Sequence, residues 1–269
     1  MTSAPASRAG PDLTVAYGPH PEQVADVRLP ADPARPAPLL LLWHGGFWRQ
    51  AHDRGYLEPM AADLAGHGFA VANIEYRRAG GEGGWPTTLV DAAEAADALP
   101  DLVERAAPGR IDRDRVVRAG HSAGGHLAVW TVLRHRLPET APGAGSPPTQ
   151  VAGVLAVAPV LDLAEAWRRG LGEHAVDAFM GGGPDQFPGR YGHAAPVELG
   201  RPPVPVTLVH GRADPRVPVE MSRHYAARTA CTLVEVAGAD HFAVVTPTSS
   251  AWPRVLDALA ALVGPEPTP

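Results

Sequence analysis

Six short apolar runs constrain the fold of this 269-residue chain more than any other feature. Each run ends at a glycine, a proline or a polar turn. They cover residues 39–43, 69–74, 115–119, 151–158, 204–209 and 232–236. Continuous apolar runs of this length are typical of strands buried on both faces of a parallel sheet.

Amphipathic helical patterns separate these runs. They cover residues 56–66, 88–103, 122–137, 218–229 and 249–263. In the second pattern, Thr88 and Asp91 suggest a capping box, and Pro100 is expected to kink or split the helix. The alternation of strand and helix predicts an α/β fold with a mostly parallel central sheet and helices on both faces.

Two segments depart from this alternation. Residues 13–17 and 24–29 alternate apolar and polar side chains around Gly18 and Pro19, which predicts an antiparallel N-terminal hairpin. Residues 161–201 contain three consecutive glycines and scattered aromatic residues, and we expect a small insertion packed over the strand ends.

The composition excludes several classes of function. All 23 basic residues are arginine, so the chain has no lysine for a Walker A motif, a kinase ATP site or a Schiff base with pyridoxal phosphate. The net charge of −6 argues against a nucleic-acid partner. Residues 1–10 lack the apolar core of a secretory signal, and no apolar stretch approaches the roughly 18 residues that span a bilayer. We therefore expect a cytoplasmic protein with no membrane partner, whose oligomeric state the sequence leaves open.

A Gly-x-Ser-x-Gly motif follows the third apolar run. Ser122 stands between Gly120 and Gly124, after a predicted strand and before a predicted helix. This context presents a serine hydroxyl at the carboxyl end of a sheet, where it can act as a nucleophile. The alternative is a glycine-rich turn with an ordinary capping serine.

The first apolar run ends in His44-Gly-Gly-Phe-Trp48. Acyl transfer requires backbone N–H donors that converge on the developing oxyanion. Glycines after a strand allow such a bend, and we expect the amides of Gly46, Phe47 and Ala123 to form the oxyanion hole. A tight turn with two core aromatic residues is the alternative.

An acid and a base follow the last two apolar runs. Asp214 lies just beyond residues 204–209, and His241 lies just beyond residues 232–236. The order Ser122, Asp214, His241 is that of the α/β-hydrolase triad. Asp162, which follows residues 151–158, is a rival for the acid.

Other polar and aromatic residues receive weaker assignments. His121 and His126 are five residues apart, on different helix faces, and no His-Glu-x-x-His motif occurs, so we expect no metal and no organic cofactor. His44 and His210 each begin a glycine turn and are expected to orient it through hydrogen bonds. Four aromatic residues are candidate walls of a substrate pocket or, equally, plain core: Trp48, Trp85, Trp167 and Phe179.

Taken together, these residues resemble the α/β-hydrolase superfamily, in particular its esterase branch with kynurenine formamidase-like (arylformamidase) and dienelactone-hydrolase-like proteins. The resemblance covers most of the chain. It rests on Tyr17-Gly18 with Gln23 and Asp26, His44 to Trp48, Glu75-Tyr-Arg-Arg78, Gly120 to His126, His210-Gly211 with Asp214, and Asp240-His-Phe242. It implies that residues 1–269 form one α/β-hydrolase domain with a cap-like insertion at residues 161–201.

The resemblance also implies a serine hydrolase that cleaves a small carboxylic ester or an aryl formamide such as N-formylkynurenine through an acyl-enzyme. A peptidase similar to prolyl oligopeptidase is the nearest enzymatic alternative, because it shares the His-Gly-x-x-Asp-x-x-Val-Pro run that begins at His210. A non-catalytic binding protein with an α/β-hydrolase fold is the alternative from another class.

Overall fold

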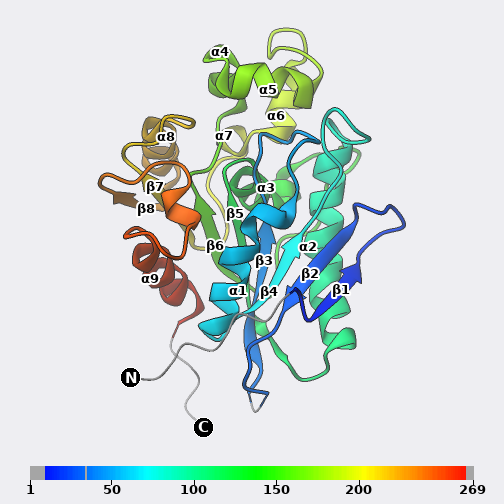
Figure 1. The fold of residues 1–269 in the computed structure, drawn as a ribbon. Coiled ribbons are helices and arrows are strands. Elements are labelled where there is room, and N and C mark those ends of the chain that lie inside the picture. The colour runs from blue at the N-terminus through cyan, green and yellow to red at the C-terminus, as the bar shows by residue number, and fades with distance from the viewer. Residues whose placement is uncertain (1–9, 34, 265–269) are drawn as a thin grey trace.

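The computed structural model describes residues 10–33 and 35–264, and its centre is one sheet of eight strands in the order β1-β2-β4-β3-β5-β6-β7-β8 (Figure 1). The strands are β1 (Leu13–Ala16), β2 (Val24–Arg28), β3 (Ala37–Trp43), β4 (Ala70–Ile74), β5 (Ile111–His121), β6 (Val151–Val157), β7 (Val206–Gly211) and β8 (Thr232–Val236). The α-helices are α1 (Glu58–Gly66), α2 (Thr87–Ala106), α3 (Ala123–Leu133), α4 (Leu163–Arg168), α5 (Leu171–Met180), α6 (Pro188–Ala194), α7 (Pro196–Leu199), α8 (Val219–Thr229) and α9 (Trp252–Val263).

The strand directions confirm the predicted sheet. Strands β1 and β2 form an antiparallel pair, and β2 is antiparallel to β4. All remaining neighbours are parallel, from β4 through β3, β5, β6 and β7 to β8. The six apolar runs therefore all lie in the parallel part of the sheet, and the alternating segments form its antiparallel edge.

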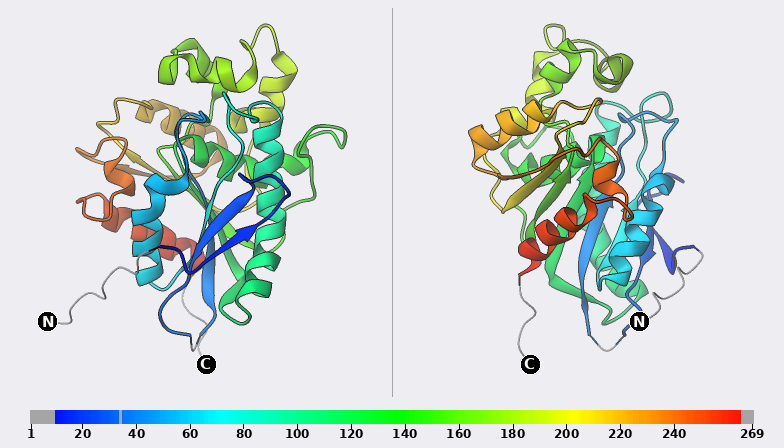
Figure 2. Two further views of the ribbon diagram at one scale, coloured as in Figure 1. Left: turned by 45° about the vertical axis from the view of Figure 1, so that its right-hand side comes forward. Right: turned by 60° about the vertical axis from the view of Figure 1, so that its left-hand side comes forward.

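Helices cover both faces of the sheet (Figure 2). Buried side chains of α2, α3 and α8 pack with one set of strand side chains, and those of α1 and α9 pack with the other set. The central strands are apolar on both faces, since Leu39, Leu40, Leu41 and Leu42 have no exposed surface. Burial on both sides explains why these strands appear in the sequence as unbroken apolar runs.

Helix α2 corrects two details of the sequence analysis. It continues through Pro100 from Thr87 to Ala106, so the proline does not split it. Its N-terminus has no side-chain cap, and the predicted capping box is wrong. The Thr88 hydroxyl instead donates to the Arg77 carbonyl, and the Asp91 carboxylate binds the Arg77 guanidinium. Tertiary partners have replaced the local hydrogen bonds of a capping box.

Residues 161–201 form an insertion that contains helices α4 to α7, and it lies above the carboxyl ends of the strands in Figure 1. A run of left-handed residues, Gly172, Glu173 and His174, interrupts α5 near its start. No helix among the described residues is long and apolar enough to cross a membrane. Residues 1–9, which bear on the expected lack of a secretory signal, lie outside the described part of the chain.

The first turn of α3 approaches the end of β3 very closely. A Cβ atom added at Gly124 would lie 2.0 Å from the Trp43 carbonyl oxygen, and one added at Gly120 would lie 2.2 Å from the Gly124 carbonyl oxygen. Backbone occupies both places, so no side chain can turn aside to make room. The two motif glycines thus allow the strand, the turn and the helix to pack in direct contact.

We predict that Gly124→Ala destabilises the fold, because the new methyl group would overlap backbone and force α3 away from β3. The expected loss in the free energy of unfolding is about 1–3 kcal/mol, as for other overpacked sites, and urea unfolding measures it. Gly189→Ala is the matched control, because a Cβ atom at that helical position meets no atom within 4 Å. Equal stability of the two variants would contradict the prediction.

Candidate active site

Ser122 stands at the sharp turn between β5 and α3. Its backbone has φ 56° and ψ −119°, a strained conformation for a residue with a side chain. The turn is held by the Ser122 N–H, which donates to the Val157 carbonyl at 2.8 Å. Only 1% of Ser122 is exposed. The strained turn between β5 and α3 matches the strand-to-helix context that the sequence predicted.

The loop after β3 lies directly against this serine. A Cβ atom added at Gly45 would lie 2.9 Å from the Ser122 Cβ atom. Gly46, Phe47 and Trp48 all have positive φ, at 94°, 52° and 55°, so the backbone bends sharply here. Among the described residues, the N–H groups of Gly46, Phe47 and Ala123 have no hydrogen-bond partner. These are the three amides that the sequence analysis assigned to an oxyanion hole.

Asp214 and His241 meet beyond the ends of β7 and β8. His241 Nδ1 donates to Asp214 Oδ2 at 2.6 Å, and both side chains are buried. The other carboxylate oxygen, Asp214 Oδ1, accepts the backbone N–H groups of Arg216 and Val217 at 2.8 and 2.9 Å. The structure therefore brings together the acid and the base that the sequence analysis selected.

A second histidine contacts the same carboxylate. His210 Nε2 lies 3.2 Å from Asp214 Oδ2 and donates to the Val217 carbonyl, and its Nδ1 atom lies 2.7 Å from the Ser222 hydroxyl. Burial by itself would raise the pKa of Asp214, but the hydrogen bonds from His210 and His241 hold it well below its ordinary value. Asp214 is thus a fixed negative charge behind the imidazole of His241.

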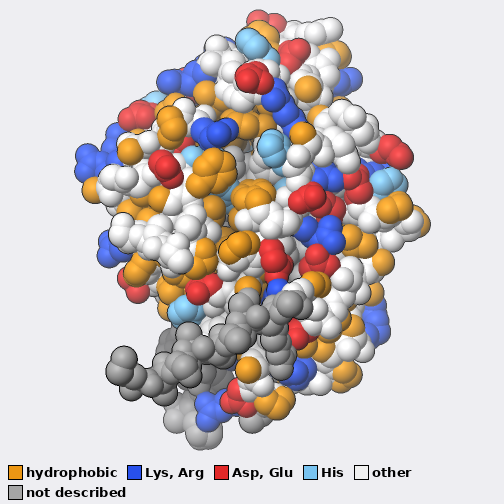
Figure 3. Space-filling model, viewed as in Figure 1, with side chains coloured by type: hydrophobic (Ala, Val, Ile, Leu, Met, Phe, Trp, Pro, Cys, Tyr) orange, Lys and Arg blue, Asp and Glu red, His pale blue; other side chains and the backbone are white. Residues whose placement is uncertain are grey.

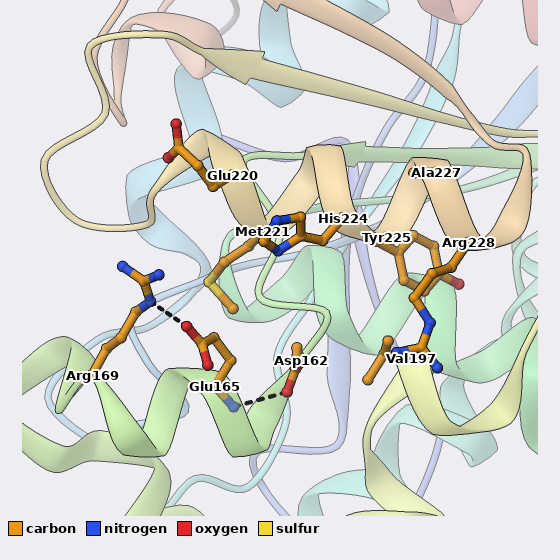
Figure 4. Close-up of a pocket in the computed structure, with 10 residues that line it drawn as sticks. All are labelled: Asp162, Glu165, Arg169, Val197, Glu220, Met221, His224, Tyr225, Ala227 and Arg228. Atoms are coloured by element: carbon orange, nitrogen blue, oxygen red, sulfur yellow. Dashed lines mark hydrogen bonds and ion pairs between the residues drawn. The ribbon is translucent and has the colours of Figure 1, made fainter.

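Asp162, the alternative candidate for the acid, caps a helix instead of contacting His241. Its carboxylate accepts the Glu165 N–H at 2.8 Å and so caps the N-terminus of α4. Asp162 also lines a cleft of about 300 Å³ between α4 and α8, together with Glu165 and His224 (Figure 4). The sequence analysis preferred Asp214 from its strand position, and the structure shows that Asp214, not Asp162, contacts His241.

A chain of hydrogen bonds joins three loops of the site. The Gly45 N–H donates to the Tyr56 hydroxyl at 2.6 Å, and that hydroxyl lies 2.9 Å from His121 Nδ1. His121 Nε2 donates to the His241 carbonyl at 2.9 Å. Burial lowers the pKa of His121 well below its ordinary value, so its ring is neutral and Nδ1 accepts the Tyr56 proton. Tyr56 and His121 thereby connect the glycine loop, the serine turn and the base.

A buried charge cluster supports the glycine loop from behind. His44 Nε2 lies 2.8 Å from Glu75 Oε1, and its ring stacks on Tyr76 at 4.4 Å between centroids. Burial alone would raise the pKa of Glu75, but His44 and Arg78, which lies 2.9 Å away, hold it below its ordinary value. His44 Nδ1 also lies 2.8 Å from the Gly45 carbonyl, so His44 orients its own turn as expected.

His126 links the same loop to the insertion. Its Nδ1 atom accepts the Trp48 indole N–H at 3.2 Å, and its Nε2 atom donates to the Ala194 carbonyl at 2.9 Å. Burial lowers the pKa of His126 to about 4, which keeps the ring neutral for both bonds. The Trp48 ring also stacks on Phe179 of the insertion at 4.5 Å.

The four candidate pocket residues therefore lie in different surroundings. Trp48 and Phe179 have no exposed surface and connect the glycine loop to the insertion. Trp85 is half-buried, with its backbone N–H bonded to the Phe179 carbonyl. Trp167 donates to Asp177 within the insertion. A contact of any of them with substrate stays a prediction.

The sequence analysis missed the roles of Tyr56, Glu75, His121 and His126. Both histidines were weighed there as possible metal ligands. Their positions, within the serine motif for His121 and two residues after it for His126, were the signal that could have indicated these roles. Among the described residues, no group of three or more His, Cys, Asp or Glu side chains could hold a metal ion.

The surface around the site is partly aromatic. Phe242, next to His241, is 45% exposed, and Tyr56 is 36% exposed although its hydroxyl is hydrogen bonded. Figure 3 shows hydrophobic and histidine side chains below the insertion, among charged groups. Aromatic side chains thus lie beside His121 and His241 at the surface.

The sheet order, the serine turn and the loops at the strand ends define an α/β-hydrolase fold, and solved structures confirm it. A truncated carbohydrate esterase from gut microbiota has a TM-score of 0.75 and 17% identity, with 95% of this chain and 99% of that chain covered. Esterase 2 of Thermogutta terrifontis with bound propionate has a TM-score of 0.71 and 23% identity, with both chains fully covered.

Within this fold the chain belongs to the BD-FAE family, which it matches over residues 25–228. It is also similar to two esterases of Mycobacterium tuberculosis. Esterase LipC is 27% identical over 84% of this chain and 58% of its own length, and esterase LipQ is 29% identical over 79% and 51%. The chain therefore spans little more than half the length of these relatives.

We predict that Tyr56→Phe lowers kcat/KM for an ester by about tenfold, since it leaves the buried Gly45 N–H and His121 Nδ1 without their shared partner. Steady-state kinetics measures the change. Tyr225→Phe is the matched control, because the buried Tyr225 hydroxyl has no hydrogen-bond partner within the described structure. If both variants keep the parent rate, the hydrogen-bond chain has no part in positioning the site.

Acid should weaken the fold less in Asp214→Asn than in the parent protein. The folded state holds Asp214 ionised to a lower pH than the unfolded state does, so its contribution to stability is lost as pH falls below the unfolded value of about 3.9. Urea unfolding between about pH 6 and about pH 3 measures this loss. Equal declines in the two proteins would show that Asp214 has an ordinary pKa.

Proposed function

We propose that the protein is a serine hydrolase that cleaves small carboxylic esters through an acyl-enzyme. The observation that carries the proposal is the 2.6 Å hydrogen bond between His241 and Asp214 in loops at the same end of the sheet as the strained Ser122. Similarity to LipC and LipQ supports the ester as the bond that is cleaved.

Each residue of the site has a role in this chemistry. Ser122 Oγ attacks the acyl carbon while His241 takes its proton, and the carbonyl oxygen gains the negative charge. The free amides of Gly46, Phe47 and Ala123 stabilise that oxyanion. His241 then returns the proton to the leaving alcohol, and a water molecule releases the acid and regenerates Ser122.

Asp214 orients His241 and stabilises its charged form during this cycle. A permanently ionised carboxylate at His241 Nδ1 fixes the tautomer whose Nε2 atom accepts the serine proton, and it stabilises the imidazolium that forms. The contact with His210 and two backbone amides holds the carboxylate in one orientation.

The surroundings of the serine favour compact acyl groups. Ser122 is almost fully buried, and the insertion lies close to the glycine loop. A Cβ atom at Gly172 would meet the Phe47 ring at 2.6 Å, and Arg49 donates to the Glu173 carbonyl at 2.9 Å. An aryl formamide has a smaller acyl group still, and the resemblance to arylformamidases makes it the second substrate class to test. We also propose that the only partner is this small-molecule substrate, with no nucleic acid and no membrane. The proposed location is the cytoplasm.

The direct test is covalent labelling with a fluorophosphonate. The parent protein should be labelled at Ser122, and Ser122→Ala should lose the label together with nearly all esterase activity, a fall of several orders of magnitude. Asp214→Asn should be severely impaired, whereas Asp162→Asn should stay near the parent rate because Asp162 only caps α4. A folded parent protein that takes no label would be a binding protein rather than an enzyme.

The same proteins separate the substrate classes. We expect p-nitrophenyl acetate and butyrate to be cleaved faster than long-chain esters, with Ser122→Ala as the blank. N-formylkynurenine tests the formamide, and an aminoacyl-proline anilide tests the peptidase alternative. If the anilide is cleaved faster than every ester, the protein is a peptidase and the proposed esterase function is wrong.

A further inference from the structure

A second cleft lies on the face of the sheet covered by α2 and α3. Its volume is about 380 Å³, and the middle of α2, strand β5 and residues 146–151 surround it. Its charged lining consists of Arg113, Arg118, Arg134, Asp97 and Asp101. Arg118 lies on β5 four residues before Ser122, so the two Cα atoms are about 13 Å apart along the strand direction.

Arg118 is an unusual residue for its place. It lies in the interior of a parallel sheet, paired with Leu41 of β3 and Val154 of β6, both of which have no exposed surface. Only 5% of Arg118 is exposed. A charged side chain in an apolar row normally has an ion-pair or hydrogen-bond partner.

No such partner exists for Arg118 in residues 10–33 and 35–264. Its Nε and Nη1 atoms are buried and make no hydrogen bond, and its guanidinium forms no ion pair with a described carboxylate. Arg134 is nearly as buried and also has an unpartnered Nε atom. Donors without acceptors thus lie together beside one cleft.

The carboxylates of the cleft are already occupied. Asp97 pairs with Arg134, and Asp101 pairs with Arg113. The lining contains three arginines and two aspartates, so it carries one excess positive charge. Asp97 is near enough to Arg118 to raise its pKa, but no ion pair or hydrogen bond joins them. Burial and the nearby Arg134 lower the pKa of Arg118 to about 10, which leaves the guanidinium charged at neutral pH.

An uncompensated buried charge costs free energy, and an anion in the cleft would offset that cost. Guanidinium groups bind carboxylate and phosphate oxygens especially well, because their N–H groups match the spacing of two oxygens. The hydroxyls of Ser146 and Thr149, which also line the cleft, are further donors for such a ligand.

We propose that this cleft is a binding site for a small oxyanion ligand, a carboxylate or a phosphate, with Arg118 as its counter-charge. The site is separate from Ser122 and does not depend on the proposed esterase reaction. Arg134 lines the buried side of the cleft and Arg113 lines its exposed side, and both are paired with an aspartate.

Thermal unfolding and calorimetric titration test the site with acetate and inorganic phosphate as probes, and chloride at equal ionic strength as the reference. We expect one of the two probes to raise the Tm of the parent protein and to bind at one site per chain. The probe that does so identifies the ligand as carboxylate or phosphate. Arg118→Met should lose the effect, with affinity at least about tenfold weaker.

Arg118→Met should also raise the Tm in buffer without either probe, because it removes an unpaired buried charge. Arg115→Gln is the matched control, since Arg115 lies on the same strand, pairs with Asp112 and does not line the cleft. It should keep the response to the probe. Arg113→Gln, at the exposed side of the cleft, should weaken binding without affecting folding.

Three results would overturn the proposal. The first is a parent protein whose Tm responds to neither probe beyond the chloride reference. The second is a response that Arg118→Met retains, because the anion then binds elsewhere, as an ester-derived acid would at Ser122. The third is an equal loss of response in Arg115→Gln, because the effect would then reflect general charge.

Discussion

The contact between the first turn of α3 and the carboxyl end of β3 is the constraint on which the rest of the site depends. Gly124 lies so close to the Trp43 carbonyl that any side chain there would overlap it. This approach places the strained Ser122 beside Gly45, at the start of the bent loop that contains Gly46 and Phe47. The proposed nucleophile and the proposed oxyanion donors can share one site because two backbone segments meet without side chains between them.

Around this contact the protein uses neutral, buried histidines as connectors. His121 ties the serine turn to the base loop and to Tyr56, and His126 ties α3 to Trp48 and to the insertion. Burial lowers the pKa of both rings, so each can donate from one nitrogen and accept at the other. An imidazolium would have two donors and could not accept the indole N–H of Trp48. The low pKa values are therefore part of how the loops are held in place.

Charged groups have distinct roles at the two ends of the sheet. Near the carboxyl ends of the strands, Glu75 and Asp214 are buried, but histidine, arginine or backbone N–H groups satisfy each of them. Farther down β5, Arg118 is buried among apolar neighbours and has no partner in the part of the chain that the structure describes. Hydrogen bonds and ion pairs offset the free-energy cost of burying Glu75 and Asp214. No such contact among the described residues offsets the cost of burying Arg118.

The sequence by itself determined the sheet, the order of its parallel strands along the chain and the motif glycines, because burial on both faces and close backbone contact leave direct marks on residue type. It also selected Ser122, Asp214 and His241 as residues at strand ends. Asp162 also follows a parallel strand, and only the tertiary structure shows which of the two carboxylates contacts His241. The partners of Tyr56, His121 and His126, and the missing partner of Arg118, depend on side chains that are far apart in the chain, and local sequence patterns carry no record of such contacts.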